Sequence, residues 1–413
     1  MTAVVPASPS VITIKLDTAQ VAWSRWTQIS FARDLQNIAG GFEADYVDEG
    51  RIAQSLSTLI TPPPFFRIVR PGMACSVAID GELVMVGWID DVDITWEAGS
   101  LTAKLRGRDK TGDLVDCAAL PEGPAEFRNV DLLHVATAVC RPFGITVRAD
   151  VDIGEPFERL SKYPHETAMA FLEKASRQRS VLLVSDGVGG LLLTRGGTQA
   201  GPSPLTRPGN IQGGGLRASW QQRFSDYYVK GQTDGYRARG ATPVALDSTV
   251  VPLSAGPAAA SPAATTTARS TVLMTGHVRD PEITRYRPTV RLTRTQSGMS
   301  TTQEQAEWAL RVARGQGDHL TYKVAFWRAG NPAKLWRPNE RVTVTDPYVD
   351  IDKPMLVAGV HYTFGPAGQH TELRVVGLTA YDRINESERR RQRRTRSTAT
   401  RPLDSSVTPL KAP

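Results

Sequence analysis

WIDDVDITWEAGSLTAKLRG (residues 88–107) contains two runs in which apolar and polar residues alternate, from Asp91 to Trp96 and from Leu101 to Arg106. Such alternation is typical of β-strands that bury one face. If the four residues 97–100 form the loop, apolar residues of the two runs face each other, and two acids face two bases. The predicted pairs are Trp96 with Leu101, Ile94 with Ala103, Val92 with Leu105, Thr95 with Thr102, Asp93 with Lys104 and Asp91 with Arg106. A slip by one residue would spoil both faces, so the stretch predicts a β-hairpin with one solvent-facing charged side.

The next residues, GRDKTGDL (107–114), place two glycines five positions apart after a predicted strand. The spacing is that of a phosphate-binding loop, which also requires a lysine and a hydroxyl after the second glycine. Asp113 and Leu114 occupy those two positions. The carboxylate of Asp113 would repel a phosphate, and Leu114 cannot hold a magnesium ion. We therefore interpret the stretch as a turn into a short helix, TGDLVDCAAL, with Thr111 or Asp113 as its N-cap.

The chain of 413 residues has an ordinary composition for a folded protein, with 40% hydrophobic and 22% charged residues. No apolar run approaches the roughly 18 residues that cross a bilayer. The first residues lack the basic start and apolar block of a signal peptide, so we expect no membrane anchor. Cys75, Cys117 and Cys140 are far apart and form no C-x-x-C pair, which argues against a disulfide framework or a zinc site.

The net charge of +7 is concentrated at the C-terminal end. Residues 385–413 hold eight Lys or Arg and three Asp or Glu, a net +5, which leaves +2 for the other 384 residues. The folded part therefore does not carry the basic excess expected of a nucleic-acid-binding domain. Six arginines dominate the tail: Arg389, Arg390, Arg391, Arg393, Arg394 and Arg396. We expect a disordered tail that binds nucleic acid, an acidic partner or nothing specific.

Three helix-like segments interrupt the predicted strands, at residues 129–143, 164–178 and 302–314. Asn129 is the expected N-cap of the first segment. Thr301 and Glu304 are spaced as a capping box at the start of the third, and Gly315 is expected to end it. The second runs into SVLLVSDGVGGLLLTR (180–195), where two apolar runs and a glycine-rich turn predict a hairpin.

No nucleophile elbow, H-E-x-x-H or dinucleotide fingerprint is present, and no two of the six histidines are three or four residues apart. We therefore expect no catalytic residue, no cofactor and no metal site. Glu43 and Asp45, in GFEADYVDEG (41–50), are the nearest approach to the paired carboxylates of a cell-wall hydrolase. Because they alternate with apolar residues, an edge strand followed by a turn is the favoured interpretation.

Several stretches, taken in order, resemble the baseplate hub proteins of Mu-type contractile phage tails. That family is related to the late-control D proteins and to the hub part of type VI secretion spikes. The stretches are VRPGMACSVAIDGELVMVGWIDDV (69–92), LRGRDKTGDLVDCA (105–118), HETAMAFLEKASRQRSVLLVSDGVGGLLLTR (165–195), LRASWQQRFSDYYVKGQ (216–232), DPEITRYRPTVRL (280–292), AEWALR (306–311) and LWRPNERVTVTDPYVDIDKPMLVAGVHYTF (335–364). The ordered set, which spans about 10–384, is specific although no single motif is. His165 and the low-complexity insertion 243–270 depart from the family pattern.

The resemblance implies a mainly β fold with α+β insertions. It comprises two small β-barrel domains that form a pseudo-sixfold ring in a homotrimer, an α/β domain and a small helix-bearing domain. The expected division is 10–118 for the first hub barrel, 119–205 for the α/β domain with two helices and a hairpin, 206–281 with 331–384 for the second hub barrel, 282–330 for the helix-bearing domain and 385–413 for the basic tail. Residues 243–270 are expected to be a flexible insertion.

The function implied by the resemblance is that of a structural hub in the virion, assembled in the host cytoplasm. It would join the sixfold tail tube to the threefold central spike and form part of the DNA-ejection channel. Expected partners are two further copies of the chain, the central spike protein, the tail tube or a tube-adaptor protein, baseplate wedge proteins and the tape-measure C-terminus. DNA would pass without specific binding.

Interface residues are expected from residue type alone, because Trp and Arg dominate such contacts. They are Trp336 and Arg337 in LWRPN, together with the six tail arginines. Two alternative functions remain open at this point. One is a tail-associated peptidoglycan hydrolase that uses Glu43 and Asp45, and the other is the hub of a type VI-like contractile injection device.

Overall fold

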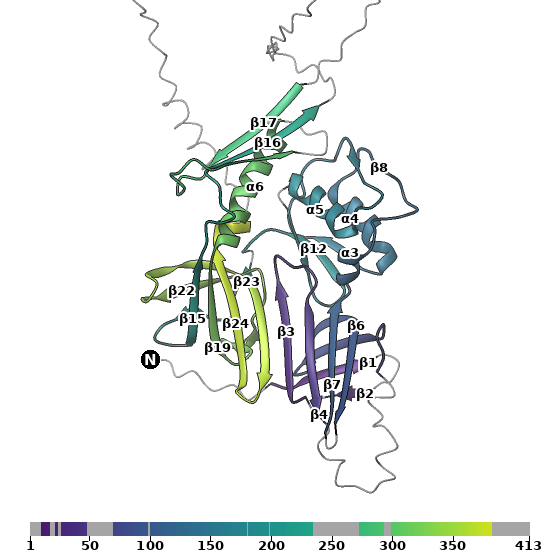
Figure 1. Ribbon diagram of the computed structural model, residues 1–413, viewed down its shortest axis with the longest axis vertical. Helices are drawn as coiled ribbons and strands as arrows, with labels where there is room; N and C mark the ends of the chain where they lie inside the picture. Colours follow the sequence, from purple (N-terminus) through teal and green to yellow (C-terminus); the bar gives the residue numbers. More distant parts are fainter. Residues whose placement is uncertain are drawn as a thin grey trace, which may run out of the picture.

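The structure is a computed structural model that describes residues 10–16, 21–23, 26–47, 69–97, 100–179, 181–197, 199–233, 272–292 and 299–381. Within these residues the chain is mainly β with few helices, as the sequence predicts (Figure 1). The insertion 243–270 and the tail 385–413 lie outside the described residues. No helix in the described part of the chain is long and apolar enough to span a membrane.

One sheet of fourteen strands forms the lower part of the molecule (Figure 1). Its first block contains β1 (Ile12–Leu16), β2 (Val21–Trp23), β3 (Gln28–Asp34), β4 (Gly41–Val47), β5 (Ala74–Ile79), β6 (Glu82–Glu97) and β7 (Ser100–Asp109). Its second block contains β13 (Gln199–Ala200), β14 (Leu205–Thr206), β15 (Ile211–Ala218), β19 (Asp318–Ala325), β22 (Glu340–Asp346), β23 (Ile351–Gly365) and β24 (Gly368–Gly377). The main path, β15-β19-β24-β23-β3-β4-β7-β6-β5-β1-β2, has two ends, so the described strands close no barrel through hydrogen bonds.

The hairpin predicted from residues 88–107 is formed by β6 and β7 in the predicted register. All six predicted residue pairs are present, and Glu97 additionally pairs with Ser100, so the loop is shorter than expected. Val92 and Ile94 pack against the core, whereas Asp93 is exposed. The acidic run is therefore a solvated face of a strand, as the alternation predicts.

The second block repeats the strand plan of the first. β23 and β24 pair in the register of β6 and β7 when residue numbers are shifted by 268: Gly365 with Gly368 corresponds to Glu97 with Ser100, and Gly359 with Arg374 corresponds to Asp91 with Arg106. Both hairpins have a bulge at the same place, between residues 357 and 359 and between residues 89 and 91. On the other side, the first half of β23 pairs with β22, as the first half of β6 pairs with β5.

Strand β3 joins the two blocks. It pairs with β4 on one side and with β23 on the other, in an antiparallel ladder between residues 29–34 and 359–364. A single hydrophobic cluster contains buried residues of both blocks. Because the ladder and the core are both continuous, the two blocks form one structural unit.

An α/β part covers one end of the first block (Figure 1). It consists of α3 (Gly112–Asp116), β8 (Glu126–Phe127), α4 (Leu132–Cys140), η1 (Arg141–Phe143), β9 (Thr146–Ala149), β10 (Leu160–Ser161), α5 (Ala168–Arg179), β11 (Leu182–Ser185) and β12 (Gly190–Thr194). The predicted hairpin is β11 with β12, and it carries a parallel third strand, β9. The N-cap predicted at Asn129 is wrong. Asp131 caps α4 by accepting the backbone N–H of His134 at 2.7 Å, whereas Asn129 has φ +51° before the helix.

A small sheet with one long helix lies above the second block (Figure 1). It contains β16 (Asp226–Thr233), β17 (Val272–Arg279), β18 (Pro288–Leu292) and α6 (Met299–Gly317). The remaining described elements are the short β20 (Arg328–Ala329), β21 (Lys334–Leu335) and η2 (Leu378–Tyr381). α6 extends beyond the predicted 302–314 at both ends, so Thr301 lies inside it and Gly315 does not end it. The helix instead ends at Gly317, whose backbone approaches that of Ser219 so closely that a Cβ would lie 2.5 Å from the Ser219 oxygen.

Candidate functional site: a charged face of the long sheet

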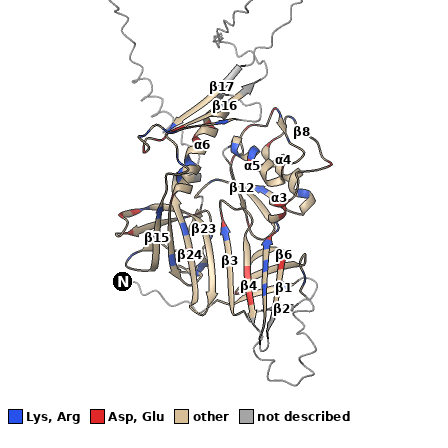
Figure 2. Cartoon of the chain, in the orientation of Figure 1, with Lys and Arg blue, Asp and Glu red and all other residues tan. Residues whose placement is uncertain are grey.

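The outward face of β3, β4, β7 and β6 carries rows of alternating charge. Since side chains alternate along a strand, the acids of β4 and the bases of β7 point to the same side. The sheet register places Ser30, Glu43, Arg106 and Asp91 in one row across the four strands. Figure 2 shows the acidic positions of β4 beside the basic positions of β7.

The charges of this face compensate one another. Arg106 lies between two acids, with its Nε 3.3 Å from Glu43 Oε1 and its Nη1 3.5 Å from Asp93 Oδ2. Lys104 Nζ lies 3.7 Å from Asp45 Oδ2. Exposed pairs of this kind contribute at most about 1 kcal/mol each. They leave a hydrated surface on which acids and bases are paired across strands.

Glu43 and Asp45 do not lie on an edge strand, and that prediction is wrong. β4 is an inner strand between β3 and β7. An inner strand of an antiparallel sheet can keep one face in water, so polar alternation does not distinguish it from an edge strand. Both carboxylates are held in ion pairs with bases of β7, which differs from the arrangement of a free acid and base that glycoside hydrolysis requires.

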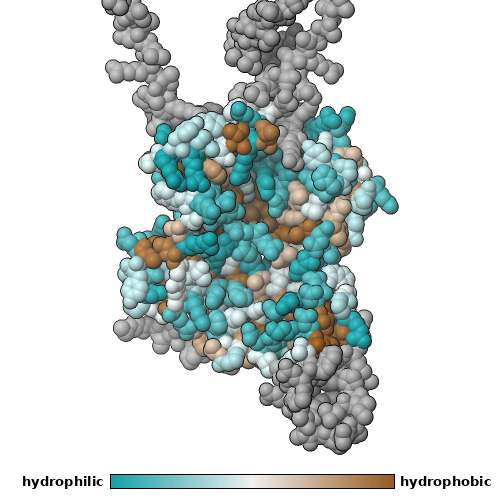
Figure 3. All heavy atoms as spheres, in the orientation of Figure 1, coloured by the Kyte–Doolittle hydropathy of each residue, from teal (hydrophilic) through white to brown (hydrophobic). Residues whose placement is uncertain are grey.

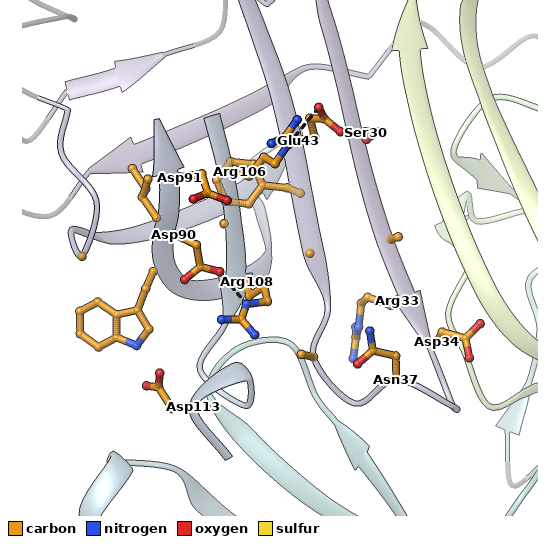
Figure 4. A pocket seen from close by; sticks show the side chains of 18 residues that line it. Ser30, Arg33, Asp34, Asn37, Glu43, Asp90, Asp91, Arg106, Arg108 and Asp113 are labelled. Atoms are coloured by element: carbon orange, nitrogen blue, oxygen red, sulfur yellow. Dashed lines mark hydrogen bonds and ion pairs between the residues drawn. The ribbon is translucent and has the colours of Figure 1, made fainter. Parts of the chain in front are cut away.

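A surface cavity of about 950 Å³ lies where this face meets α3 (Figure 4). Its charged lining residues are Arg33, Asp34, Glu43, Asp90, Asp91, Arg106, Arg108 and Asp113. Arg108 bonds to Asp90 and to Asp116, each at 2.6 Å, and these hydrogen bonds raise the pKa of Arg108. No cluster of three or more His, Cys, Asp or Glu in the described ranges is arranged to hold a metal.

A buried carboxylate fixes the first block to the α/β part. Asp109 is 2% exposed and accepts hydrogen bonds from the hydroxyls of Thr111 (2.5 Å) and Ser185 (2.7 Å) and from the backbone N–H groups of Gly40 and Thr111. Burial raises the pKa of the Asp109 carboxyl, and the hydrogen bonds act against this shift. Thr111 precedes α3, as predicted, but its side chain bonds to Asp109 and makes no cap bond.

Asp109 was not singled out from the sequence, although it lies within GRDKTGDL. The usable signal is its position directly after an alternating strand and before Thr-Gly, where the chain must turn. That signal indicates a turn, and it does not indicate that the carboxylate is buried. The burial depends on Ser185, which is 76 residues away in the sequence.

The two residues predicted for an interface in LWRPN have different environments. Trp336 is 1% exposed and belongs to the hydrophobic core. Arg337 is exposed and binds Glu82 of the first block, with Nη2 2.6 Å from Oε1. Arg328 also binds Glu82, at 2.8 Å, so this corner of the two blocks is held by ion pairs within the chain. Contact of Trp336 or Arg337 with another chain stays a prediction, and the six tail arginines lie outside the described residues.

A second buried network, missed from the sequence, links the small sheet to the second block. Arg223 is fully buried and bonds to Asp280, Glu282 and Asp318. Arg314 of α6 also bonds to Asp280, at 2.6 Å. An arginine in QQRFS gives no local sign that it will be enclosed by acids from two distant segments, 280–282 and 318.

Most of the surface in view in Figure 3 is hydrophilic, with separate hydrophobic patches rather than a continuous apolar band. Among the described residues, the exposed large apolar side chains include Leu216 at the edge of the long sheet and Val290 and Leu292 on β18. Isolated apolar side chains on a surface are ordinary, whereas those at a free strand edge can contact a partner.

Three protein-family models match successive parts of the chain. Residues 13–109 match the N-terminal domain of proteins like the Mu phage baseplate assembly protein GpP. Residues 111–195 match the second domain of proteins like the baseplate hub protein gp44. Residues 298–383 match the fourth domain of the Mu phage baseplate assembly protein GpP.

Individual proteins and structures are similar over most of the chain. The baseplate hub protein gp44 of Escherichia phage Mu is 29% identical over 324 residues, which are 77% of this chain and 75% of that protein. The crystal structure of the 43 kDa tail protein of prophage MuSo2 from Shewanella oneidensis matches with a TM-score of 0.72 and 30% identity, covering 90% of this chain and 99% of that one. The tail protein from Neisseria meningitidis MC58 has the same fold, with a TM-score of 0.69 and 20% identity over 92% of this chain and 100% of that one.

Proposed function

This chain belongs to the baseplate hub proteins of Mu-type phage tails, and on that premise we propose that it works as a homotrimeric adaptor on the tail axis. Its role is structural, and its place is in the tail of the virion. The observation that carries the proposal is the repeat of one strand plan in two blocks joined edge to edge. Three chains supply six such blocks, each block acting as one small barrel-like unit.

Symmetry explains why such an adaptor is useful. A ring of six similar blocks can match a sixfold tail tube, whereas the three chains retain a threefold axis that a trimeric spike can use. We propose the central spike protein, the tube or a tube-adaptor protein, and the baseplate wedge proteins as partners. DNA would leave through the central channel without sequence-specific binding, in agreement with the charge of +2 on residues 1–384.

We propose that the arginine-rich tail binds an acidic surface on the spike, on the C-terminus of the tape-measure protein or on a neighbouring subunit. Six arginines lie within residues 389–396. Guanidinium groups bind carboxylates with paired hydrogen bonds, and a flexible basic segment can reach a partner without disturbing the folded part. The density of these arginines in the sequence supports the proposal.

The division into five parts is also proposed. It assigns 10–118 to the first barrel, 119–205 to the α/β domain, 206–281 with 331–384 to the second barrel, 282–330 to the helix-bearing domain and 385–413 to the tail. Separate hydrophobic clusters support the α/β part and the small sheet as units distinct from the long sheet, whose single cluster spans both blocks. Since β16 and β17 pair with each other and β16 pairs with β18, the helix-bearing domain would also include residues 226–233 and 272–279. β19 (Asp318–Ala325) would belong to the second barrel instead, because it pairs with β15 and β24.

The two alternative functions are not favoured. A peptidoglycan hydrolase would need a free acid and base at Glu43 and Asp45, and these are paired with Arg106 and Lys104. A type VI-like injection device is less well supported than a phage tail, because the matched family models and the 30% identical prophage protein belong to Mu-type phages.

Electron microscopy of the assembled tail tests the proposal. The expected result is three copies of this chain around the axis, between the tube and the spike, with the long sheet facing the channel. A density for this chain outside the axis, among the peripheral baseplate proteins, would contradict it.

A further inference from the structure

Among the described strands, two edges of the long sheet have no partner, whereas the corresponding edges in the other block are paired. β23 has two successive partners on the side away from β24, because residues 351–356 pair with β22 and residues 359–364 pair with β3. β6 pairs with β5 through residues 82–88. On that same side, no strand of the described residues pairs with residues 91–97.

The second open edge belongs to β15. In the second block, β19 has the place of β4, because Thr321 pairs with Arg374 as Glu43 pairs with Arg106. β15 then has the place of β3, because Gly215 pairs with Thr321 as Ser30 pairs with Glu43. β3 is paired on both sides, whereas β15 pairs only with β19 among the described strands.

We propose that β15 of one copy pairs antiparallel with residues 91–96 of β6 in a second copy of the chain, repeating between subunits the joint that β3 and β23 make within one subunit. The proposal rests on the trimeric ring proposed above and names the surfaces that close it. Each subunit offers both edges, so the contact is head-to-tail and closes into a ring when successive subunits are rotated by one third of a turn.

The internal joint fixes the register of the proposed one. Each residue of β23 corresponds to the residue of β6 whose number is 268 lower, and each residue of β3 corresponds to the residue of β15 whose number is 185 higher. Applied to the observed pairs between β3 and β23, these two correspondences predict the residue pairs between subunits. These pairs are Val92 with Ala218, Asp93 with Arg217, Ile94 with Leu216 and Thr95 with Gly215.

The side chains at these positions are complementary. Leu216 is 55% exposed in the position where β3 has Phe31, which is 2% exposed against Tyr362. In the proposed register Leu216 meets Ile94, which is half-buried at the margin of the core. Pairing of the two edges would therefore remove an exposed leucine from water and extend the core between subunits.

The charged pair and the glycine fit the same register. Asp93 and Arg217 are both exposed and would lie directly opposite each other, as favourable cross-strand pairs do. A Cβ built on Gly215 meets no atom within 4 Å, so nothing within the described chain requires glycine there. Glycine in a strand is typical of a place where another backbone approaches closely. A slip of one residue would place Arg217 opposite an apolar residue and Leu216 opposite a polar one.

Disulfide trapping tests the contact. Opposed residues of an antiparallel pair have Cα atoms about 4.5–5.5 Å apart, within the range that a disulfide spans. In a Cys117→Ser background, which leaves only the buried Cys75 and Cys140, the chain carries Asp93→Cys and Arg217→Cys together. Mild oxidation is expected to convert most of the protein into covalent trimers and dimers on a non-reducing gel. The matched control, Asp93→Cys with Leu216→Cys, places the thiols on opposite faces and should give at least tenfold less.

Light scattering on the same unoxidised samples separates the two levels of the proposal. A trimer that forms no cross-link at positions 93 and 217 would overturn this contact and leave the proposed ring standing. A monomer would overturn both. A charge exchange provides an independent check, since Asp93→Arg and Arg217→Asp should each weaken trimerisation at least tenfold and the double variant should restore it. Failure of the double variant to restore the trimer would count against the proposed register.

Discussion

Phe31 and Tyr362 stack at the joint between the two blocks, with ring centroids 5.9 Å apart and ring planes inclined by 8°. Both side chains are buried, and the Tyr362 hydroxyl donates a hydrogen bond to the carbonyl of Trp336. Beside them Arg374 forms two hydrogen bonds with the Asp34 carboxylate. The joint is therefore built like a protein core rather than like a contact between mobile domains, which allows the two blocks to act as one segment of a ring.

Removal of the Phe31 ring should be costly for this reason. Phe31→Ala is expected to lower the free energy of unfolding by about 3–5 kcal/mol, because it removes a buried aromatic and leaves a cavity beside Tyr362. Denaturant unfolding measures the change. The control Tyr286→Ala removes an aromatic that is 88% exposed and should cost less than about 0.5 kcal/mol. Equal effects of the two substitutions would show that the joint is not part of the core.

Substitution of Asp109 tests the junction with the α/β part. Asp109→Asn keeps the shape of the side chain but replaces one carboxylate oxygen with an NH₂ group, which is a donor. Some of the groups that donate to Asp109, which include the backbone N–H of Gly40, the backbone N–H of Thr111 and the hydroxyl of Ser185, would then have no acceptor. A buried polar group without a partner costs about 1–3 kcal/mol. We expect a loss of about 2–4 kcal/mol in unfolding free energy, together with faster amide exchange in residues 182–194. Asp113→Asn, a few residues away on α3, should change either quantity little; a similar loss there would contradict the account.

The register of the hairpin in residues 88–107 could be predicted because it depends only on the local alternation of apolar and charged residues. The joint between β3 and β23 could not, since Asp34 and Gly359 are paired across 325 positions and neither strand carries a local sign of its partner. The same reason explains the wrong assignment of β4 to an edge. Its charged face is visible in the sequence, but its two neighbours are not.

Buried polar residues set a second limit on prediction. Asp109 and Arg223 resemble surface charges in the sequence, because burial of a charge depends on partners supplied by distant segments. The N-cap of α4 illustrates a smaller ambiguity. Asn129 and Asp131 are equally good N-caps by residue type, and the positive φ of Asn129 decided between them. The interface predicted at Trp336 followed residue type alone, and burial of this side chain is a tertiary property.

Glu340 should make stability depend on pH near neutrality. Burial raises the pKa of this carboxyl to about 7, against its usual value of 4.5. Between these two values the folded state holds a proton that the unfolded state has lost, so stability is greater at low pH and falls as the pH rises through 7. The slope can reach about 1.4 kcal/mol per pH unit. Glu340→Gln should reduce this slope between pH 5 and 7, measured by denaturant unfolding at several pH values. Glu158→Gln, at an exposed position of the α/β part, is the control and should leave the slope unchanged. Identical slopes in all three proteins would refute the assignment.

Arg223 should hold the small sheet on the second block. Arg223→Ala leaves the buried carboxylate of Asp280 with Arg314 as its remaining charged partner, and removal of one member of a buried ion pair costs about 3–5 kcal/mol. Hydrogen exchange should then increase most in β16, β17 and the second half of α6. Arg285→Ala, at an exposed position of the same part, is the matched control. Uniform exchange across the chain after Arg223→Ala would argue against a local role.

Truncation after Ile384 removes the six tail arginines and leaves the described fold complete. The mass of the assembled protein should be unchanged, because the internal joint and both edges of the proposed contact between subunits lie within residues 28–364. Binding to an acidic partner should weaken at least tenfold, and the salt dependence of the remaining binding should fall. Unchanged binding to the spike and to the tape-measure C-terminus, with unchanged infectivity, would show that the tail is dispensable.

The mass of the purified chain in solution tests the central claim most directly. Light scattering should give about 135 kDa, three times the 45.0 kDa of one chain, and this value should persist on dilution through the micromolar range. A mass of 45.0 kDa that remains unchanged at high concentration and in the presence of the spike protein would contradict a trimeric hub.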